Sequence, residues 1–316
     1  MKRIFTIAIQ MDSLDAIDIS VDSTFALALE GQSRGYTLYH YLPSDLSMKN
    51  GAVVARARSL RLDIQTHEFV LDNQEILNLS EIDVVLMRQD PPFDMSYITA
   101  THLLERIQTH TLVVNNPSHV RNSPEKLFVT EFQDLTPPTL ITRDQNLIKA
   151  FRTDYGDIII KPLYGNGGAG VFHIEPENEN LNALVELFFS QSREPIIVQQ
   201  YLPEIRDGDK RIILVNGIAV GAVSRVPMRG EARANLHVGA TAQKTTINPR
   251  DQEICDSIGP ILRDKGLIFV GIDIIGDYLT EINITSPTGI KEINRLDNVH
   301  LEKVIWDAIE ENIVQT

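Results

Sequence analysis

The amino-acid sequence predicts an α/β fold built from two or three packed units. The first observation is that short apolar runs alternate with segments of helical periodicity, which is typical of layered helices and sheets. The second is the length of 316 residues, since about 150 residues make one domain. The third is a change of pattern after residue 122, where a Gly-rich segment and a new hairpin signal replace the regular alternation.

The N-terminal unit, residues 1–122, is expected to be an open, largely parallel sheet with crossover helices. Asp22 and Ser23 provide the N-terminal cap of a first helix, and Gly35 marks its end. The pair Asn50-Gly51 is a hairpin signal, because both residues readily adopt positive φ. The expected strands are residues 3–9, 37–42, 83–88 and 112–115, and the expected helices are residues 23–34 and 96–110.

A central unit, residues 123–203, is expected to follow. It begins with a short helix, and the pair Pro137-Pro138 marks a boundary inside it. A strand then enters a Gly-rich segment at residues 165–170, and a second strand leaves that segment. The expected strands are residues 157–161, 171–174 and 195–202, and the expected helices are residues 124–132 and 180–190.

The C-terminal unit, residues 204–316, carries a second hairpin signal at Asn216-Gly217. Residues 226–242 are rich in Gly, Ala and Arg and have no apolar period, so we expect a mobile loop there. The expected strands are residues 210–215, 218–225, 267–275 and 278–284, and the expected helices are residues 250–265 and a terminal helix from residue 301.

The composition argues against several classes of protein. The 43 acidic residues outnumber the 29 Lys and Arg residues, which gives a net charge of −14. A body this negative repels phosphate backbones, so nucleic-acid binding is not expected as the main task. No run approaches the roughly 18 apolar residues that a membrane span requires. Cys255 is the single cysteine, which excludes an internal disulfide and fits a reducing cytoplasm.

A Gly-rich segment directly follows one of the expected strands. Lys161 ends the strand, and the next strand begins after Gly165, Gly167, Gly168 and Gly170. Glycines let backbone N–H groups turn toward a ligand, and such loops hold phosphate oxygens that a neighbouring Lys can neutralise. The pattern is neither a P-loop nor a dinucleotide fingerprint, since no helix is expected after it. These residues alone fit a phosphate-binding loop and a flexible hairpin equally well.

Three polar side chains, Asp273, Glu281 and Asn283, interrupt strands that are otherwise apolar. Glu281 and Asn283 are two residues apart and therefore share one strand face. Oxygen ligands without His or Cys suit Mg²⁺, and the Gly-rich segment favours this interpretation over a structural salt bridge. A regular two-residue turn at Gly276-Asp277 would point Asp273 to the opposite face. We therefore expect a longer turn or a β-bulge that places Asp273 opposite Glu281.

Basic side chains lie in or beside these two features. In an acidic protein they are candidates for contacts to carboxylate and phosphate groups, although each one alone also fits a solvated surface charge. Arg88 ends an expected N-terminal strand just before the segment Gln89-Asp90-Pro91-Pro92. The others are Lys126, Lys161, Lys210, Arg211, Arg225, Arg229 and Arg233.

Over essentially its whole length the chain resembles the bacterial glutathione synthetases of the ATP-grasp superfamily. Long runs match in the family's order, which is far more specific than the Asp…Glu-x-Asn set alone. The matching runs are residues 87–94 (MRQDPPFD), 125–128 (EKLF), 161–170 (KPLYGNGGAG), 200–203 (QYLP), 207–211 (DGDKR), 266–277 (GLIFVGIDIIGD) and 280–288 (TEINITSPT). The resemblance implies an ATP-grasp fold preceded by the open-sheet N-terminal domain.

The resemblance also implies a reaction, in which ATP phosphorylates the cysteinyl carboxylate of γ-glutamylcysteine. The amine of glycine then attacks the acyl phosphate, and glutathione, ADP and phosphate are released. Such catalysis consists of positioning and charge stabilisation. The family further implies ATP with two Mg²⁺ or Mn²⁺ ions, small-molecule substrates rather than nucleic acid or membrane, and a cytoplasmic homotetramer.

The resemblance assigns roles to individual residues. Contacts to the nucleotide fall to Lys126, Lys161, Gly165, Gly167, Gly168, Gln200, Tyr201, Leu202 and Asp209. The metal ions fall to Asp273, Glu281 and Asn283. Substrate carboxylates and the acyl phosphate fall to the catalytic arginines Arg211, Arg225 and Arg233 and to Arg88, Asn235 and Ser286. Residues 225–242 would form a lid over the substrates.

Three positions depart from the family's pattern. Gln200 stands where Asn is usual, Ala240 follows Gly239 where a glycine pair is usual, and Gly289 stands where Cys is usual. Two other functions remain open from the residues: a sister ligase acting on D-alanine or on the C-terminal glutamate of a protein, and an ATP-binding module without catalysis. The Asp…Glu-x-Asn set and the Arg-rich loop argue against the module.

Overall fold

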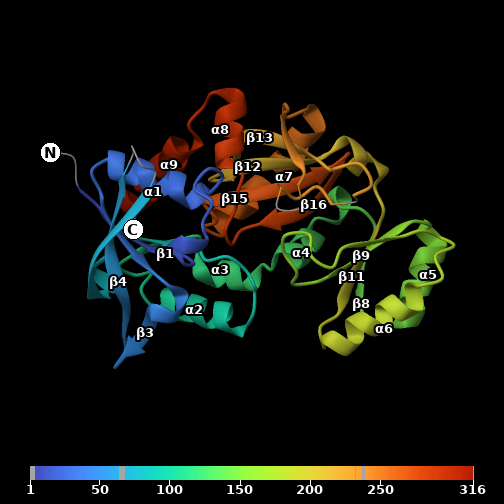
Figure 1. The fold of residues 1–316 in the computed structure, drawn as a ribbon, viewed down its shortest axis with the longest axis horizontal. Helices are drawn as coiled ribbons and strands as arrows, with labels where there is room; N and C mark the ends of the chain where they lie inside the picture. The colour runs from blue at the N-terminus through green and yellow to red at the C-terminus, as the bar shows by residue number, and fades with distance from the viewer. Residues whose placement is uncertain (1–3, 64–67, 232, 237–238, 316) are drawn as a thin grey trace.

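The computed structural model describes residues 4–63, 68–231, 233–236 and 239–315. Three β-sheets form the framework of this part of the chain. In Figure 1 the N-terminal sheet lies at the left, a four-stranded sheet at the right and a five-stranded sheet between them. The predicted α/β fold class is therefore confirmed.

The N-terminal sheet has a parallel half and an antiparallel half. Its strands are β1 (Thr6–Gln10), β2 (Thr37–Tyr41), β3 (Leu46–Lys49), β4 (Ala52–Asp63), β5 (Glu68–Asn78), β6 (Val84–Met87) and β7 (Leu112–Val114). β1, β2, β6 and β7 pair in parallel, as predicted. β3, β4 and β5 pair antiparallel, and the sequence analysis identified none of these three as a strand.

The turn between β3 and β4 is the predicted Asn-Gly hairpin. Asn50 has φ +52° and Gly51 has φ +89°, and Lys49 pairs with Ala52 across the turn. Positive φ at both central residues matches the twist of a tight hairpin, which explains the Asn-Gly pair.

Helices cover both faces of the N-terminal sheet. Side chains alternate between the faces along a strand, so Ile7 and Ala8 of β1 point in opposite directions. Ile7 belongs to a core that includes residues of α1 (Ser23–Ser33) and α9 (Leu301–Gln315). Ala8 belongs to a core that includes residues of α2 (Met95–Glu105). As predicted, the Asp22 side chain caps α1, accepting a hydrogen bond from the backbone N–H of Phe25 at 2.5 Å.

Helices α1 and α9 are joined through one fully buried aromatic residue and one arginine. The indole N–H of Trp306 donates to the Leu27 carbonyl at 2.8 Å, and its ring lies 5.4 Å from that of Tyr36. Arg34, at the end of α1, contacts Asp307 and Glu310 of α9 at 2.7 and 2.5 Å. These contacts attach the C-terminal helix to the N-terminal sheet.

The four-stranded sheet forms the central unit and is antiparallel throughout. Its order is β10-β9-β11-β8, from β8 (Thr139–Thr142), β9 (Ile158–Pro162), β10 (Phe172–Ile174) and β11 (Ile196–Gln200). Helices α5 (Gln145–Tyr155) and α6 (Leu181–Gln191) pack on it and complete a core of its own. In Figure 1 this unit extends to the right of the rest of the molecule.

The five-stranded sheet is also antiparallel, in the order β14-β13-β12-β15-β16. Its strands are β12 (Asp209–Val215), β13 (Ile218–Val226), β14 (Thr241–Lys244), β15 (Phe269–Ile275) and β16 (Tyr278–Asn283). The predicted hairpin joins β12 to β13, with Asn216 at φ +48° and Gly217 at φ +75°. This sheet shares both of its cores with the N-terminal sheet, whereas the central unit has a separate core.

The remaining helices are α3 (Pro117–Asn122), α4 (Glu125–Phe128), α7 (Pro249–Asp264) and α8 (Ile290–Asp297). The sequence analysis did not identify α3, α5 and α8. The expected helix at residues 124–132 is shorter than predicted, because a 3-10 turn at Val129–Glu131 follows α4. No helix of the described residues is long and apolar enough to cross a membrane.

The loop expected at residues 226–242 has different bounds in the structure. Val226 ends β13 and Thr241 and Ala242 begin β14, where Val226 pairs with Thr241 and Arg225 pairs with Ala242. The irregular segment is therefore residues 227–240, of which residues 232, 237 and 238 lie outside the described residues. Its mobility stays a prediction.

Candidate active site

A cavity of about 660 Å³ is lined by residues of all three units. This volume lies within the range of ~300–1,000 Å³ that is typical of small-molecule sites. The cavity brings together all of the predicted site residues except Arg88. Segments more than 150 residues apart in sequence therefore meet at one place.

Two lysines and two glutamates lie together in this cavity. Lys161, near the end of β9, lies 3.3 Å from Glu281 Oε1, and Lys126 of α4 lies 3.8 Å from the same oxygen. Lys126 also donates to the Gly165 carbonyl and lies 3.7 Å from Glu125. Burial, reinforced by the charge of Glu281, raises the pKa of Glu125 to about 7. Burial alone would raise the pKa of Glu281, but Lys126 and Lys161 outweigh it and hold that pKa below its ordinary value.

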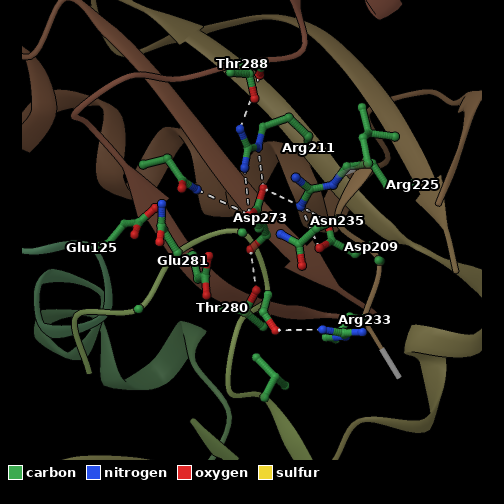
Figure 2. Close-up of a pocket in the computed structure, with 18 of the residues that line it drawn as sticks. Glu125, Asp209, Arg211, Arg225, Arg233, Asn235, Asp273, Thr280, Glu281 and Thr288 are labelled. Carbon is green, nitrogen blue, oxygen red and sulfur yellow. Dashed lines mark hydrogen bonds and ion pairs between the residues drawn. The ribbon is translucent and has the colours of Figure 1, made fainter. Parts of the chain in front are cut away.

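Asp273 of β15 is held by two arginines (Figure 2). Arg211 donates to both carboxylate oxygens, at 2.5 Å from Nε and 2.9 Å from Nη2, and Arg225 Nη2 lies 2.9 Å from Oδ1. Burial would raise the pKa of Asp273, but the two guanidinium groups outweigh it and hold that pKa well below its usual range. Arg225 also contacts both oxygens of Asp209 at 2.6 Å, although burial still raises the pKa of Asp209 to about 6.

The register of β15 and β16 confirms the predicted bulge. Asp273 pairs with Glu281, whereas Ile274 pairs with Leu279 and Ile275 with Tyr278, so Thr280 is the extra residue. A two-residue turn is thus combined with a shift of register between Asp273 and Ile274. The bulge brings the side chain of Asp273 to the face of Glu281 and Asn283, and the Asn283 amide donates to Asp273 Oδ2 at 3.3 Å.

The Gly-rich loop lies against the segment at residues 227–240. Gly167 and Gly168 have φ +61° and +79°. A Cβ on Gly168 would lie 2.6 Å from the side-chain oxygen of Asn235, and the positive φ of Gly168 also favours glycine there. Arg233 also donates to the Gly168 carbonyl at 3.3 Å. Both loops therefore line one side of the cavity.

The end of β11 and the residues that follow it form another wall of the cavity. Gln200, Tyr201 and Leu202 follow one another along it. The backbone N–H of Tyr201 donates to the Asp157 carbonyl at 2.9 Å. The Tyr201 ring stacks on His173 with centroids 4.0 Å apart, and His173 Nε2 lies 3.0 Å from Asp157. His173 and Asp157 therefore hold Tyr201 in place, and Tyr201 is one of the residues predicted to line the adenine slot.

Arg88 lies behind this cavity rather than in its wall. It is buried and donates to Thr24 Oγ1 at 3.0 Å and to the Pro287 carbonyl at 2.9 Å. Its Nη1 has no partner among the described residues. The Ser286 hydroxyl donates to the Arg88 carbonyl at 3.3 Å. Arg88 thus supports the segment that carries Ser286.

The oxygen-donor set of Asp273, Glu281 and Asn283 fits a hard cation such as Mg²⁺. The bulge places the three side chains on one face, as shared ligands require. No group of three or more His, Cys, Asp or Glu side chains among the described residues could hold a metal by itself. The predicted ligand set of Asp273, Glu281 and Asn283 is not such a group, because it has only two carboxylates and its third ligand is the amide of Asn283.

The sequence analysis missed several residues that line the cavity. Glu125, Thr280 and Glu292 are the ones whose contacts bear on its chemistry. Glu125 and Thr280 stand directly beside Lys126 and Glu281, so proximity in sequence could have indicated them. Glu292 follows no recognised pattern, because an acid in the first turn of a helix is ordinarily exposed.

The fold and the cavity define an ATP-grasp protein. The family model of the prokaryotic glutathione synthetase ATP-grasp domain matches residues 125–298. A solved structure of the ATP-grasp ligase PsnB with Mg, ADP and a precursor variant has a TM-score of 0.62 at 17% identity, over 98% of each chain. At that identity the likeness concerns the fold alone.

Comparison with sequences is more specific. The family model of the prokaryotic glutathione synthetase N-terminal domain matches residues 5–121. The chain is 55% identical to a glutathione synthetase of Agrobacterium fabrum, over 98% of both chains. It is 54% identical to one of Brucella melitensis, over 96% of this chain and 98% of the relative. The chain belongs to the prokaryotic glutathione synthetase family.

Proposed function

We propose that this protein is an ATP-dependent ligase that joins γ-glutamylcysteine to glycine and forms glutathione. The observation that carries the proposal is the single cavity in which Lys126, Lys161 and the Gly-rich loop lie with Asp273, Glu281 and Asn283. Membership of the glutathione synthetase family selects the substrates.

The reaction has two steps. An oxygen of the cysteinyl carboxylate attacks the terminal phosphorus of ATP, and ADP leaves. The glycine nitrogen then attacks the acyl carbon and loses a proton, and the bond from that carbon to the phosphate oxygen breaks. Each step develops charge on oxygen, so fixed positive groups in a dry site accelerate it.

The residues of the cavity have matching roles in this proposal. Lys126 and Lys161 bind phosphate oxygens, and Gln200, Tyr201 and Leu202 hold the adenine. Arg225 has a buried Nε without a partner among the described residues, so this donor remains for an anionic group. Arg211, Arg233, Asn235 and Ser286 orient carboxylates and the acyl phosphate.

We propose two Mg²⁺ ions at Glu281, Asn283 and Asp273. When bound, Mg²⁺ neutralises phosphate charge. Asp273 already accepts hydrogen bonds on both oxygens from Arg211, so its first effect is to fix the position of that arginine. We further propose, from the family resemblance, that the protein forms a homotetramer in the cytoplasm. We also propose that the boundaries between the domains of each chain lie near residues 122 and 203.

The test of the function is ADP formation from ATP and γ-glutamylcysteine with glycine, β-alanine or D-alanine as the second substrate. We expect turnover with glycine and formation of glutathione, identified by mass spectrometry. Turnover only with pairs of D-alanine would instead assign a sister ligase. Sedimentation of the purified protein tests the tetramer.

A further inference from the structure

The wall of the cavity that comes from the N-terminal unit and from α8 is acidic. Asp18, Asp22 and Asp90 line it from the N-terminal unit, and Glu292 lines it from the first turn of α8. The Lys and Arg side chains of the lining come from other elements: Lys126, Lys161, Arg211, Arg225 and Arg233. The cavity therefore has a cation-attracting wall in addition to its phosphate-binding groups.

Glu292 is the residue of this wall that lacks a partner. It is only 7% exposed, and its carboxylate oxygen Oε2 has no hydrogen-bond partner among the described residues. A buried carboxylate oxygen without a donor is costly. The N-terminus of α8 stabilises negative charge at this position but supplies no specific partner. A donor brought by a ligand would satisfy this oxygen.

Among the described residues, neither Lys291 nor Arg88 forms an ion pair or hydrogen bond with the Glu292 carboxylate. The ammonium group of Lys291 donates to the Ile19 carbonyl and lies 5.2 Å from the centre of the Phe25 ring. Lys291 thus holds the segment that carries Asp18 and Asp22 against α8. Arg88 donates to Thr24 and to the Pro287 carbonyl, and its charge acts on Asp22 and Asp90 rather than on Glu292, although its Nη1 has no partner among the described residues. These carboxylates do not form a metal cluster, since no described group of His, Cys, Asp and Glu could hold one. A ligand with N–H donors fits this wall better than a divalent ion.

We infer that Glu292 binds the α-ammonium group of the γ-glutamyl substrate and makes the enzyme select substrates that carry it. This inference rests on the proposed function. The α-ammonium group is the cation of γ-glutamylcysteine, and it has three N–H donors. The amine of glycine is a poor occupant, because a neighbouring carboxylate favours its protonated form, which cannot attack the acyl phosphate.

The test compares two substrates that differ only in this group. Glutarylcysteine is γ-glutamylcysteine without the α-amino group. In the unaltered enzyme we expect kcat/KM to fall by roughly tenfold to a hundredfold when glutarylcysteine replaces γ-glutamylcysteine, as for loss of a charge-assisted hydrogen bond. In Glu292→Gln the two substrates should differ much less, with the KM for ATP unchanged. Glu186→Gln, on the exposed side of α6, is the matched control and should discriminate like the unaltered enzyme.

The other possible results distinguish failure of the Glu292 inference from failure of the proposed function. A Glu292→Gln enzyme that still prefers γ-glutamylcysteine by the original factor overturns the inference. An unaltered enzyme that makes no ADP with γ-glutamylcysteine and glycine contradicts the proposed function instead. If the Gln variant does not fold, Glu292→Asp keeps the charge on a shorter side chain. That variant should raise the KM for γ-glutamylcysteine more than the KM for glutarylcysteine, and equal changes overturn the inference.

Discussion

At the scale of single residues, the cavity pairs opposite charges before any ligand enters. Glu281 faces Lys126 and Lys161, and Asp273 faces Arg211 and Arg225. Breaking such a buried pair leaves one charge uncompensated, which is more costly than the pair is stabilising. The paired acids therefore fix the basic groups in position for an anionic ligand.

Lys161 provides the first prediction. Lys161→Ala removes a charge-assisted contact to phosphate and should weaken ATP binding by about 1.5–3 kcal/mol. Isothermal titration calorimetry measures this loss, and circular dichroism checks that the fold is kept. Unchanged nucleotide affinity would assign the Gly-rich segment to a flexible hairpin without a role in binding. Lys149→Ala, on the exposed side of α5, is the control and should bind ATP normally.

His40 provides a prediction about pH. Burial lowers the pKa of His40 below its ordinary value of 6.5, although its Nε2 lies 3.3 Å from the Asp12 carbonyl. The folded state therefore favours the neutral ring, and this contribution to stability is present above pH 6.5 and is lost as the pH falls through the folded-state pKa. We expect His40→Gln to reduce the loss of unfolding free energy between pH 7 and pH 5, measured by urea denaturation. The exposed His110→Gln should leave this slope unchanged, and equal slopes for both variants would contradict the prediction.

Much of the site follows from residue types and strand geometry. In a regular hairpin Asp273 would pair with Thr280 and lie on the face opposite to Glu281 and Asn283. This conflict was sufficient to predict a longer turn or a bulge, and the register shows the bulge. The partners of these residues were not predictable, because Arg211 and Asp273 are 62 residues apart and meet only through sheet pairing. Glu292 was missed because its burial depends on the N-terminal unit packing on α8.

At the scale of elements, Arg34 is one of the side chains that join α1 to α9. The Arg34 side chain is 11% exposed and contacts Glu30, Asp307, Glu310 and the Lys303 carbonyl. Arg34→Ala should lower the free energy of unfolding by about 1.5–3 kcal/mol, because it removes charge-assisted hydrogen bonds to Glu30 and Glu310, whose side chains are only 11% and 25% exposed. Arg61→Ala removes a similar fork from Asp72, but those side chains are 65% and 45% exposed, so the loss should be at most about 1 kcal/mol. Equal losses in chemical denaturation would contradict this account.

The segment at residues 227–240 provides a prediction about coupling. Its contacts to the Gly-rich loop suit a lid that excludes water from the acyl phosphate. Replacing residues 227–240 by a short Gly linker, with β14 intact, should leave ATP binding nearly unchanged and cut glutathione formation severely. The ratio of ADP to glutathione formed should rise above one. A shortened enzyme that keeps this ratio at one would exclude the lid.

The helices and strands were predictable where the spacing of apolar residues, the helix-capping residues and the turn residues all indicate the same element. The Asp22 cap and both Asn-Gly pairs were sufficient to place α1 and two hairpin turns, although the strands β3 and β4 beside the first turn were not identified. In β4, the buried residues Val53, Ala55 and Ala57 alternate with residues that are half-buried or exposed. The alternation was not recognised in the sequence because alanine is a poor strand former. β5 is mostly exposed and is stabilised by pairing with β4, so its sequence carries little apolar signal.

At the scale of the whole molecule, the central unit differs from the rest in having its own core. Cooperative units of stability follow such divisions. We expect hydrogen exchange, followed by mass spectrometry, to show residues 139–200 exchanging as one unit. Saturating ATP should protect this unit more than the N-terminal sheet. Uniform protection of all three sheets would contradict the prediction.

The position of Trp306 gives the molecule an optical probe. Trp306 is the single tryptophan, and it is buried between α1 and α9 in a core shared by the N-terminal and C-terminal sheets. Its emission therefore reports the separation of α9 from α1 and the entry of water there. The emission of Trp306 should not change when only the central unit unfolds. Fluorescence and far-ultraviolet circular dichroism together can distinguish opening of the central unit from global unfolding without any added label.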